Sequence, residues 1–316
     1  MIKIALVGLG ALGKRHLEAV LKCRQSMEIY CMDINPEAMS GFQPNDIYQN
    51  KKIEFVTDIN EFPTELELVI FPMSSKGRRE MFDCLVNHSS VKNIIFEKVL
   101  FQKIEDYYHV GKRLKELDIS AWVNCTRRYA PIWRELKSDL KDAECIEMHT
   151  YGGNWGLACN CVHMLDAACM ISNSDNLKIE SINLQDKVID SKRKGYKEVF
   201  GVVSGSCGKC SNFTISCYEN NLSSETIILG DNKKYIVNEA QSYYEIIEAD
   251  GVKNEKHFEP YYVSQTTTEI VNDILNKGTC DLTTFELAAK LHLQYIEPLI
   301  DFFEEKGMEK GICPIT

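Results

Sequence analysis

Residues 2–13 read Ile2-Lys3-Ile4-Ala5-Leu6-Val7-Gly8-Leu9-Gly10-Ala11-Leu12-Gly13, and a periodic apolar segment, residues 17–23, follows. This pattern predicts a strand, a tight turn with G-x-G-x-x-G spacing, and the start of a helix. Gly8 would allow the sharp turn, Gly10 would let a ligand approach the backbone, and Gly13 would let helix and strand pack closely. Because the N–H groups at such a helix start attract phosphates, we expect residues 8–13 to bind a dinucleotide. The expected contacts are Gly8, Leu9, Gly10, Ala11, Leu12 and Gly13.

A dinucleotide site of this kind needs an acidic side chain about 20 residues after the glycines. Asp33 ends the second predicted strand, residues 27–32. Its carboxylate would accept a hydrogen bond from a ribose 2′-hydroxyl and repel a 2′-phosphate, which favours NAD over NADP. The alternative is a turn aspartate after an apolar strand, but the motif and its spacing together favour the cofactor.

Composition and charge narrow the class of protein. The chain has 316 residues, of which 44% are hydrophobic and 26% charged. This length is sufficient for two domains with separate cores. Its net charge of −10, without a long block of Lys or Arg, argues against nucleic acid or a membrane surface as a partner. We therefore expect a small-molecule partner. The first apolar run is only as long as a strand, so we expect a cytoplasmic protein without a signal peptide or membrane span.

The 13 cysteines are scattered through predicted strands and helices, which favours reduced thiols in a reducing compartment. Cys207-Gly208-Lys209-Cys210 is the one C-x-x-C motif. A metal or redox role would need a second pair or a thioredoxin-like setting. Since this motif lies between two strand-like runs, we expect a plain hairpin turn and no metal site.

The first third of the chain alternates strand and helix patterns, which predicts a parallel sheet covered by helices. Strands at 53–56, 66–71, 93–96 and 119–123 would complete a six-stranded Rossmann sheet. Ligands bind such sheets at the carboxyl ends of the strands. Ser74, Ser75, Glu97 and Lys98 follow strand ends and are expected cofactor contacts. Lys98 would point into the nicotinamide region, with a solvated loop lysine as the alternative.

After a predicted helix at 133–140, strand-like segments follow one another with turns between them, which predicts a largely antiparallel sheet. These segments are 145–151, 179–184, 198–204, 212–218, 225–229, 235–237 and 243–247. Helices are expected at 160–171, at 266–275 and from the capping box at 283–286 onward, the last kinked or ended near Pro298. The sequence thus predicts an α/β protein with two domains. Residues 1–123 would form a Rossmann domain, and residues 124–316 an α+β domain built on a largely antiparallel open sheet, whose C-terminal helix can pack back on the first domain.

Four motifs occur in a specific order along the chain. They are G-x-G-x-x-G-x-x-H from Gly8 to His16, Glu97-Lys98-Val99, Arg127-Arg128-Tyr129-Ala130-Pro131, and a glycine-to-histidine element from Gly156 to His163-Met164-Leu165-Asp166. In this order they resemble the Gfo/Idh/MocA family of nicotinamide-dependent oxidoreductases, over essentially the whole chain. The resemblance implies a Rossmann domain, a second domain whose open sheet often forms a dimer interface, and an active site between the domains. It also implies a homodimer or homotetramer.

The resemblance implies catalytic roles for Lys98, which would contact nicotinamide and substrate, and His163, which would transfer a proton. Removing hydride from a carbinol carbon requires a base for the hydroxyl proton, and an imidazole, with an ordinary pKa of about 6.5, suits that task. The expected substrate contacts are Asn124, Arg127, Arg128, Tyr129, Trp155, Asn160 and His163. The alternative for His163 is a packing role on a buried helix.

The sequence departs from the family pattern at two positions. Val99 replaces the proline that follows Glu-Lys, and Cys159 stands where the family often has an aspartate, four residues before His163. Residues four apart share a helix face, so that aspartate would orient and stabilise the imidazolium, which a neutral thiol does poorly. Asn160 is within reach of the same face and is the expected substitute.

We therefore predict an NAD-dependent dehydrogenase or reductase that acts on CH–OH groups in carbohydrate metabolism. Its substrate would be a sugar, a sugar derivative, including a nucleotide-linked one, or a cyclitol. One alternative is a non-catalytic NAD-binding sensor or regulator, which the missing aspartate favours. Another is a redox-neutral enzyme that recycles bound NAD within one turnover. The fold alone does not decide among them.

Overall fold

The structure is a computed structural model that describes residues 1–39 and 50–316. The chain divides into two compact units. The first comprises residues 1–129, 262–289 and 316, and the second comprises residues 130–261 and 290–315. The division predicted from sequence falls after residue 123, six residues earlier than the first break between these units. No helix in the described part of the chain is both long and apolar enough to cross a membrane.

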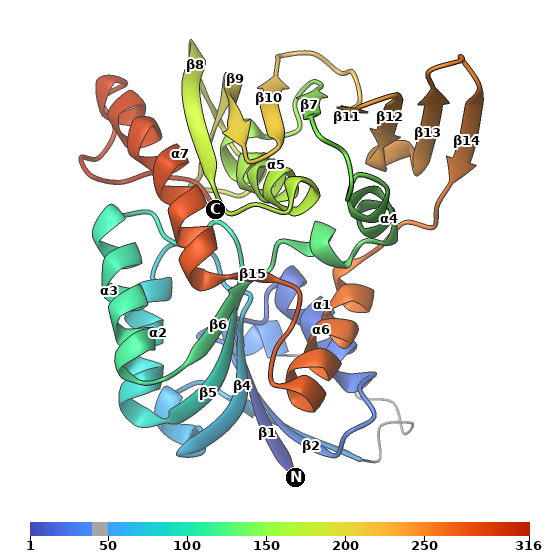
Figure 1. Ribbon diagram of the computed structural model, residues 1–316. Helices are drawn as coiled ribbons and strands as arrows, with labels where there is room; N and C mark the ends of the chain where they lie inside the picture. The colour runs from blue at the N-terminus through green and yellow to red at the C-terminus, as the bar shows by residue number, and fades with distance from the viewer. Residues whose placement is uncertain (40–49) are drawn as a thin grey trace. The chain divides into compact units, whose positions relative to one another are not determined.

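A seven-stranded sheet with strand order β15-β6-β5-β4-β1-β2-β3 forms the centre of the first unit (Figure 1). Neighbouring strands from β6 to β3 are all parallel, which confirms the predicted Rossmann sheet. β15 was not predicted, because two residues carry no periodic signal, and it pairs antiparallel with β6. The strands are β1 (Ile2–Val7), β2 (Met27–Met32), β3 (Lys51–Val56), β4 (Glu65–Phe71), β5 (Ser90–Phe96), β6 (Ser120–Val123) and β15 (Thr283–Thr284).

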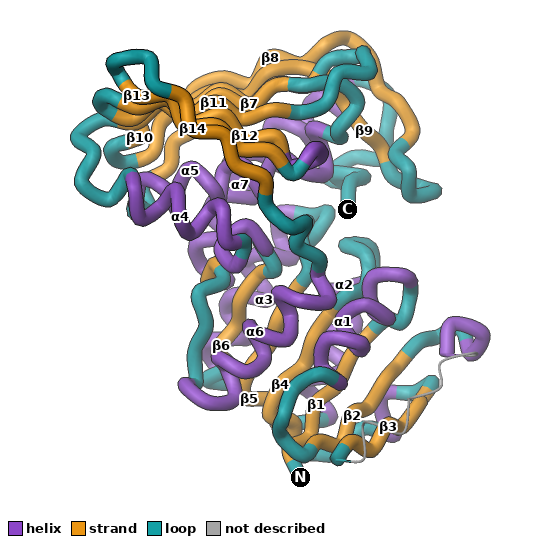
Figure 2. The backbone as a smooth tube through the Cα atoms, turned by 90° about the vertical axis from the view of Figure 1, so that its right-hand side faces the viewer, coloured by secondary structure: helices purple, strands orange, loops and turns teal. Residues whose placement is uncertain are grey.

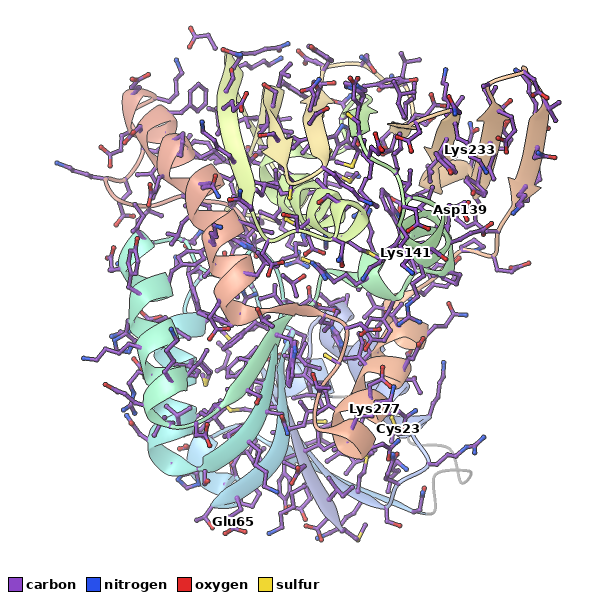
Figure 3. The ribbon with its side chains drawn as sticks, viewed as in Figure 1. Cys23, Glu65, Asp139, Lys141, Lys233 and Lys277 are labelled. Carbon is purple, nitrogen blue, oxygen red and sulfur yellow. The ribbon has the colours of Figure 1, made fainter. Side chains whose placement is uncertain are left out.

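Helices cover both faces of this sheet. α2 (Arg78–His88) and α3 (Ile104–Glu116) lie on one face, and α1 (Ala11–Leu21) and α6 (Val263–Lys277) on the other (Figures 1 and 2). Helix α6 comes from the end of the chain, yet Thr268 donates through its hydroxyl to the Ala19 carbonyl at 2.9 Å. The Cys23 thiol, just after α1, lies 3.9 Å from the Thr268 carbonyl (Figure 3). Apolar residues of α1, α6 and the central strands form one buried cluster, so α6 completes the core of the first unit.

An eight-stranded sheet with order β14-β13-β12-β11-β7-β10-β9-β8 forms the second unit. Only β7 and β10 pair in parallel among its neighbours, so the prediction of a largely antiparallel sheet is confirmed. The strands are β7 (Ile146–Tyr151), β8 (Leu177–Asp190), β9 (Lys197–Cys207), β10 (Cys210–Cys217), β11 (Glu225–Gly230), β12 (Lys233–Asn238), β13 (Tyr243–Glu248) and β14 (Lys253–His257). β14 was not predicted, since its five residues are all exposed and lack an apolar face.

The helices of the second unit lie against one face of its sheet. α4 (Pro131–Asp139) and α5 (Leu157–Ser172) share that face (Figure 2). The long helix α7 (Phe285–Glu305) passes through Pro298, so of the two predicted outcomes, a kink or an end near this proline, the end is wrong. Proline removes one backbone donor, but the buried side chains of Tyr295, Leu299 and Phe303 on either side hold the helix in place. The Tyr295 hydroxyl also donates to the Leu157 carbonyl at 2.9 Å.

Candidate functional site

The three glycines of the opening motif have distinct surroundings. Gly8 has a φ of +108°, and a Cβ atom there would lie 2.9 Å from the Met73 Cβ. A Cβ on Gly13 would lie 2.0 Å from the Gly8 carbonyl oxygen, whereas one on Gly10 would have nothing within 4 Å. Gly8 and Gly13 are therefore required by the backbone itself. Gly10 instead leaves open space beside the turn, where a ligand could approach the main chain.

The turn ends at the N-terminus of α1, which no side chain caps. Gly10 is the N-cap residue, and the first turn of the helix carries no acidic side chain. The first N–H groups of a helix have no partner within the helix, and the helix dipole makes this end positive. An uncapped N-terminus beside an open glycine is the geometry that binds the phosphates of a dinucleotide.

Asp33 lies beside this turn. Its Oδ2 accepts a hydrogen bond from the Leu9 N–H at 2.7 Å, and its Oδ1 accepts one from the Asn35 N–H at 2.9 Å. The carboxylate is half-buried at the end of β2. The two parts of the motif, 24 residues apart in the sequence, are thus joined by one hydrogen bond.

Glu97, predicted as a cofactor contact, is held in a buried network. Its Oε1 lies 3.0 Å from His16 Nε2 and accepts a hydrogen bond from the Asn124 amide, while His16 Nδ1 lies 3.0 Å from the Thr267 hydroxyl. Burial raises the pKa of Glu97, but the hydrogen bonds from His16 and Asn124 and the charge of Lys98 outweigh it, so the pKa lies below its usual value. Glu97 is therefore ionised at neutral pH and ties α1, β5, β6 and α6 together at the strand ends.

Arg78 holds the loop that carries Lys98, a role that sequence reasoning missed. The guanidinium is fully buried and donates to the carbonyls of Glu97, Val99 and Leu100 at 2.5–2.7 Å, and also to that of Met73. The peptide bond between Lys98 and Val99, where the family has proline, is cis. Arg78 follows the left-handed Gly77 at the start of α2, and an arginine at a helix start gives no signal of such contacts.

Arg78→Met is expected to lower the free energy of unfolding of the first unit by roughly 3 kcal/mol, because it leaves buried carbonyls without a donor. Urea denaturation of the wild type and the variant measures the change. Arg79→Met is the matched control, since Arg79 pairs with Asp83 at 3.0 Å on the surface and should change stability by only about 0.5 kcal/mol. Equal losses in the two variants would contradict the role of Arg78.

Further residues that were predicted for the site lie after the strands of the first unit. Ser75 is buried, and its N–H donates to the Thr316 hydroxyl at 3.0 Å; Ser74 and Lys98 are half-buried. Arg127 and Arg128 lie half-buried on the short 3-10 helix η4 (Thr126–Tyr129). The Tyr129 hydroxyl donates to Asp273 at 2.8 Å and accepts from the Asp281 N–H at 3.0 Å, so it anchors η4 to α6 and the loop after it. Burial raises the pKa of Tyr129, which keeps this hydroxyl neutral.

In the second unit, Glu198 of β9 caps the helix that carries His163, which sequence reasoning also missed. Its carboxylate accepts from the N–H groups of Ala158 at 2.8 Å and Cys159 at 3.3 Å. A Cβ on the left-handed Gly156 would lie 2.8 Å from Glu198 Oε1, so the glycine makes room for this cap. A carboxylate at a helix N-terminus is favourable, and it replaces the usual cap from a neighbouring side chain.

Four predicted residues lie on or just before α5. His163 and Asn160 are half-buried, and Cys159 is buried. Asn160 donates through its amide to the Trp155 carbonyl at 2.8 Å, and Trp155 donates through its indole to the Ser216 carbonyl at 2.9 Å. The Asn160 amide thus binds the turn before α5, and orientation of His163 by Asn160 stays a prediction.

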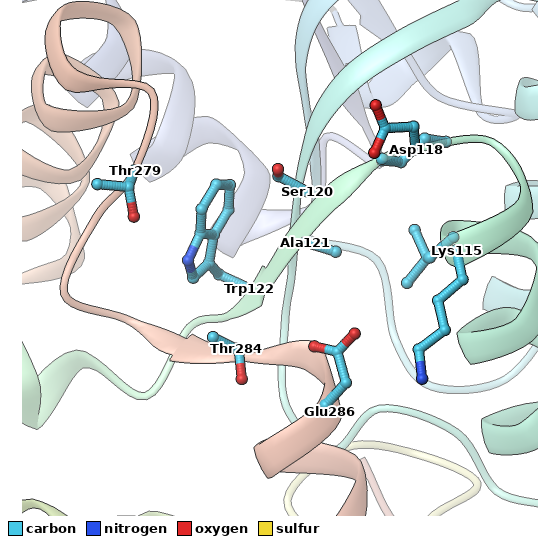
Figure 4. Close-up of a pocket in the computed structure, with 10 residues that line it drawn as sticks. Lys115, Asp118, Ser120, Ala121, Trp122, Thr279, Thr284 and Glu286 are labelled. Atoms are coloured by element: carbon cyan, nitrogen blue, oxygen red, sulfur yellow. The ribbon is translucent and has the colours of Figure 1, made fainter.

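A separate pocket of about 410 Å³ lies at the β6 edge of the first unit (Figure 4). Its wall includes the Trp122 indole, Lys115, Asp118, Ser120 and Glu286. None of the residues predicted for the cofactor or the substrate lines it. The pocket is therefore distinct from the glycine turn.

The fold and the glycine turn define a two-unit α/β protein with a Rossmann-type dinucleotide cradle. No family model matches the sequence, and no curated protein matches it. Solved structures that match almost the whole chain include the following three, and each likeness concerns the fold. A Gfo/Idh/MocA family oxidoreductase from Vibrio cholerae is 12% identical, with 98% of this chain and 100% of that chain covered and a TM-score of 0.72.

The second structure is scyllo-inositol dehydrogenase from Lactobacillus casei, with bound NAD(H) and scyllo-inositol. It is 15% identical, with 97% and 98% of the two chains covered and a TM-score of 0.66. The third is the transcriptional regulator Gal80p from Kluyveromyces lactis, 14% identical, with 96% of this chain and 90% of that chain covered and a TM-score of 0.72. The chain therefore has the fold of the Gfo/Idh/MocA family of oxidoreductases, as its four sequence motifs implied.

Proposed function

We propose that this protein is an NAD-dependent oxidoreductase that transfers a hydride between nicotinamide and a CH–OH carbon of a sugar, a sugar derivative or a cyclitol. The observation that carries the proposal is the cradle itself: open space at Gly10, the uncapped start of α1, and the Asp33 carboxylate 2.7 Å from the Leu9 N–H. The Lactobacillus casei structure, which shares the fold and holds NAD(H) with a cyclitol, supports the same cofactor and substrate class.

The bound cofactor would supply the hydride chemistry, and the residues of the chain would bind, orient and move a proton. Residues 8–13 would bind the pyrophosphate, and Asp33 the adenosine ribose. Lys98 lies in the loop whose carbonyl groups accept hydrogen bonds from Arg78. Its ammonium group would donate a hydrogen bond to the alkoxide that develops on the substrate. His163 would take the hydroxyl proton during oxidation and return it during reduction.

The family resemblance also leads us to propose a homodimer or homotetramer, and the scattered thiols favour the cytoplasm. The test of function is the absorbance of reduced nicotinamide when the protein is mixed with cofactor and a panel of sugars, nucleotide sugars and cyclitols. Net formation or consumption of NADH supports the dehydrogenase. Product without net consumption would identify an enzyme that recycles its NAD.

A second candidate is a non-catalytic NAD-binding regulator. Two observations favour it: Cys159 replaces the aspartate expected beside His163, and the regulator Gal80p shares the fold. Tight binding of NAD without turnover of any substrate in the panel would support this candidate over the enzyme.

We expect NAD(H) to bind more tightly than NADP(H) by roughly tenfold or more, because the Asp33 carboxylate would accept a hydrogen bond from a ribose 2′-hydroxyl and repel a 2′-phosphate. Asp33→Ala should remove this preference and also weaken NAD(H) binding, since the Leu9 N–H loses its acceptor. Fluorescence titrations with both cofactors measure the two effects.

The matched variant for this prediction is Asp33→Asn, which keeps an oxygen for the Leu9 N–H but removes the charge. This variant should hold the turn in place but reduce the ratio of the affinity for NAD(H) to the affinity for NADP(H). Glu65→Ala, at the opposite end of the sheet (Figure 3), should change neither affinity. An unchanged preference in Asp33→Asn would show that the carboxylate does not face the 2′ position.

A further inference from the structure

The C-x-x-C motif forms a hairpin, as the sequence predicted. The thiol that contacts the Cys207 sulfur, however, belongs to Cys169 in α5. Cys207 ends β9 and Cys210 begins β10, and the two residues pair across the turn. The Cys210 thiol lies 3.5 Å from the Asn212 carbonyl, and burial raises its pKa to about 12. The Cys207 sulfur instead lies 3.5 Å from the sulfur of Cys169, in the last turns of α5. The two sulfurs are in van der Waals contact.

The surroundings hold these two thiols together. A Cβ on Gly208 would lie 2.4 Å from the Ser174 Cβ, so the tip of the hairpin presses against the segment that follows α5. The Ser172 hydroxyl lies 3.4 Å from the Cys207 sulfur, and the Ser174 carbonyl lies 3.3 Å from it. Cys169 and Cys207 therefore belong to two elements that are in close contact.

The same contacts activate Cys207. Its hydrogen bond with Cys169 lowers the pKa, burial raises it, and hydrogen bonds with Ser172 and Ser174 lower it further. The balance lowers the pKa of Cys207, although the charge of Asp175 acts in the opposite direction. A lowered pKa favours the thiolate, the form that reacts with oxidants. Among the described residues, no group of three His, Cys, Asp or Glu side chains could hold a metal ion.

We propose that Cys169 and Cys207 form a redox-active dithiol, which peroxide oxidises to a disulfide that joins the end of α5 to the β9–β10 hairpin. This inference is independent of the proposed function. To form the disulfide, the two sulfurs must approach from 3.5 Å to about 2.05 Å.

The chemistry balances with hydrogen peroxide as the oxidant. The Cys207 thiolate attacks one peroxide oxygen, an S–O bond forms, the O–O bond breaks, and the departing hydroxide becomes water by taking up a proton equivalent to the one that the Cys207 thiol released. The Cys169 thiol then attacks the sulfenic acid and loses its proton to the departing hydroxide, so that the S–S bond forms, the S–O bond breaks, and a second water leaves. The two sulfurs lose two electrons in total, and these reduce the peroxide.

Both thiols are buried, but several residues beside them are exposed to solvent. Residues 173, 175, 176 and 208 beside the pair are exposed, and residue 173 ends α5. Helix ends open locally at low cost, which would admit a molecule as small as peroxide while excluding larger oxidants.

The test is peptide mapping of the full-length chain after oxidation. The protein is reduced, treated with hydrogen peroxide, alkylated in denaturant, and digested without reduction for mass spectrometry. Cys84→Ser/Cys145→Ser is the background, because it removes the two exposed cysteines. We expect a peptide that links Cys169 to Cys207, two fewer alkylated cysteines per chain, and full recovery after dithiothreitol.

Variants of the pair make the result specific. Cys210→Ser should leave the link intact, whereas Cys169→Ser and Cys207→Ser should abolish it. The oxidised chain should also melt roughly 5 °C or more above the reduced chain, and Cys207→Ser should show no such difference. A link between Cys207 and Cys210, irreversible oxidation of Cys207 alone, or no loss of buried thiols would overturn the proposal. The map of the parent chain decides this even where a serine variant folds poorly.

Discussion

His163→Ala is expected to lower kcat by about 10²–10⁴-fold, the contribution of a well-placed general acid or base. The affinity for NAD(H) should hardly change, because the glycine turn and Asp33 lie in the other unit of the chain. Steady-state kinetics on an active substrate and a cofactor titration separate the two effects.

Two further variants distinguish proton transfer from packing. His163→Gln keeps a side chain of similar size that can form hydrogen bonds but cannot carry the proton, so it should be as slow as His163→Ala. His149→Ala, on β7 of the same unit with its imidazole 3.3 Å from Glu147, should leave kcat unchanged. Recovery of activity in His163→Gln would instead identify His163 as a packing residue.

Lys98→Met is expected to lower kcat by about 10²–10³-fold, the loss typical when one donor to a developing oxyanion is removed. Binding of NAD(H) should change little if, as proposed, the glycine turn and Asp33 bind the dinucleotide. The comparison of kcat with cofactor affinity therefore tests a role in the chemical step.

Lys92→Met is the control for Lys98→Met. Lys92 lies on β5, the strand that precedes Lys98, but it is exposed and pairs with Glu67 at 2.8 Å, so its loss should leave turnover unchanged. Lys98→Arg should recover only part of the activity, because the planar guanidinium cannot place a donor where the ammonium does. Turnover of Lys98→Met at the wild-type rate would refute the role assigned to the end of β5.

Several elements follow from local patterns in the sequence, and the structure confirms them. The strand, turn and helix at residues 2–21 depend on a short apolar run and on glycines that the local backbone requires. The 3-10 turn η3 (Ile59–Glu61) begins with a capping box between Asp58 and Glu61, a pattern that is local in the sequence. Pro298 shows the limit of such patterns, since tertiary packing carries α7 past a residue that disfavours helix.

The candidate site was predictable only in part. Strand ends locate Asp33 and Lys98, because parallel strands bring their carboxyl ends to one edge of a sheet. The partners of these residues were not predictable. Arg78, which holds the Lys98 loop, and Glu198, which caps the His163 helix, contact backbone atoms 19 or more residues away and leave no periodic signal.

The sequence by itself determined the parallel and the antiparallel sheet, the dinucleotide turn and the hairpin at Cys207 and Cys210, because periodicity, glycine conformation and short-range spacing are local properties. Only the tertiary structure decided that α6 covers the Rossmann sheet and that Glu97 lies in a network with His16 and Asn124. It also decided that Cys207 meets Cys169, 38 residues away, rather than its neighbour in the motif. These contacts depend on which distant surfaces pack together, and that depends on burial across the whole chain.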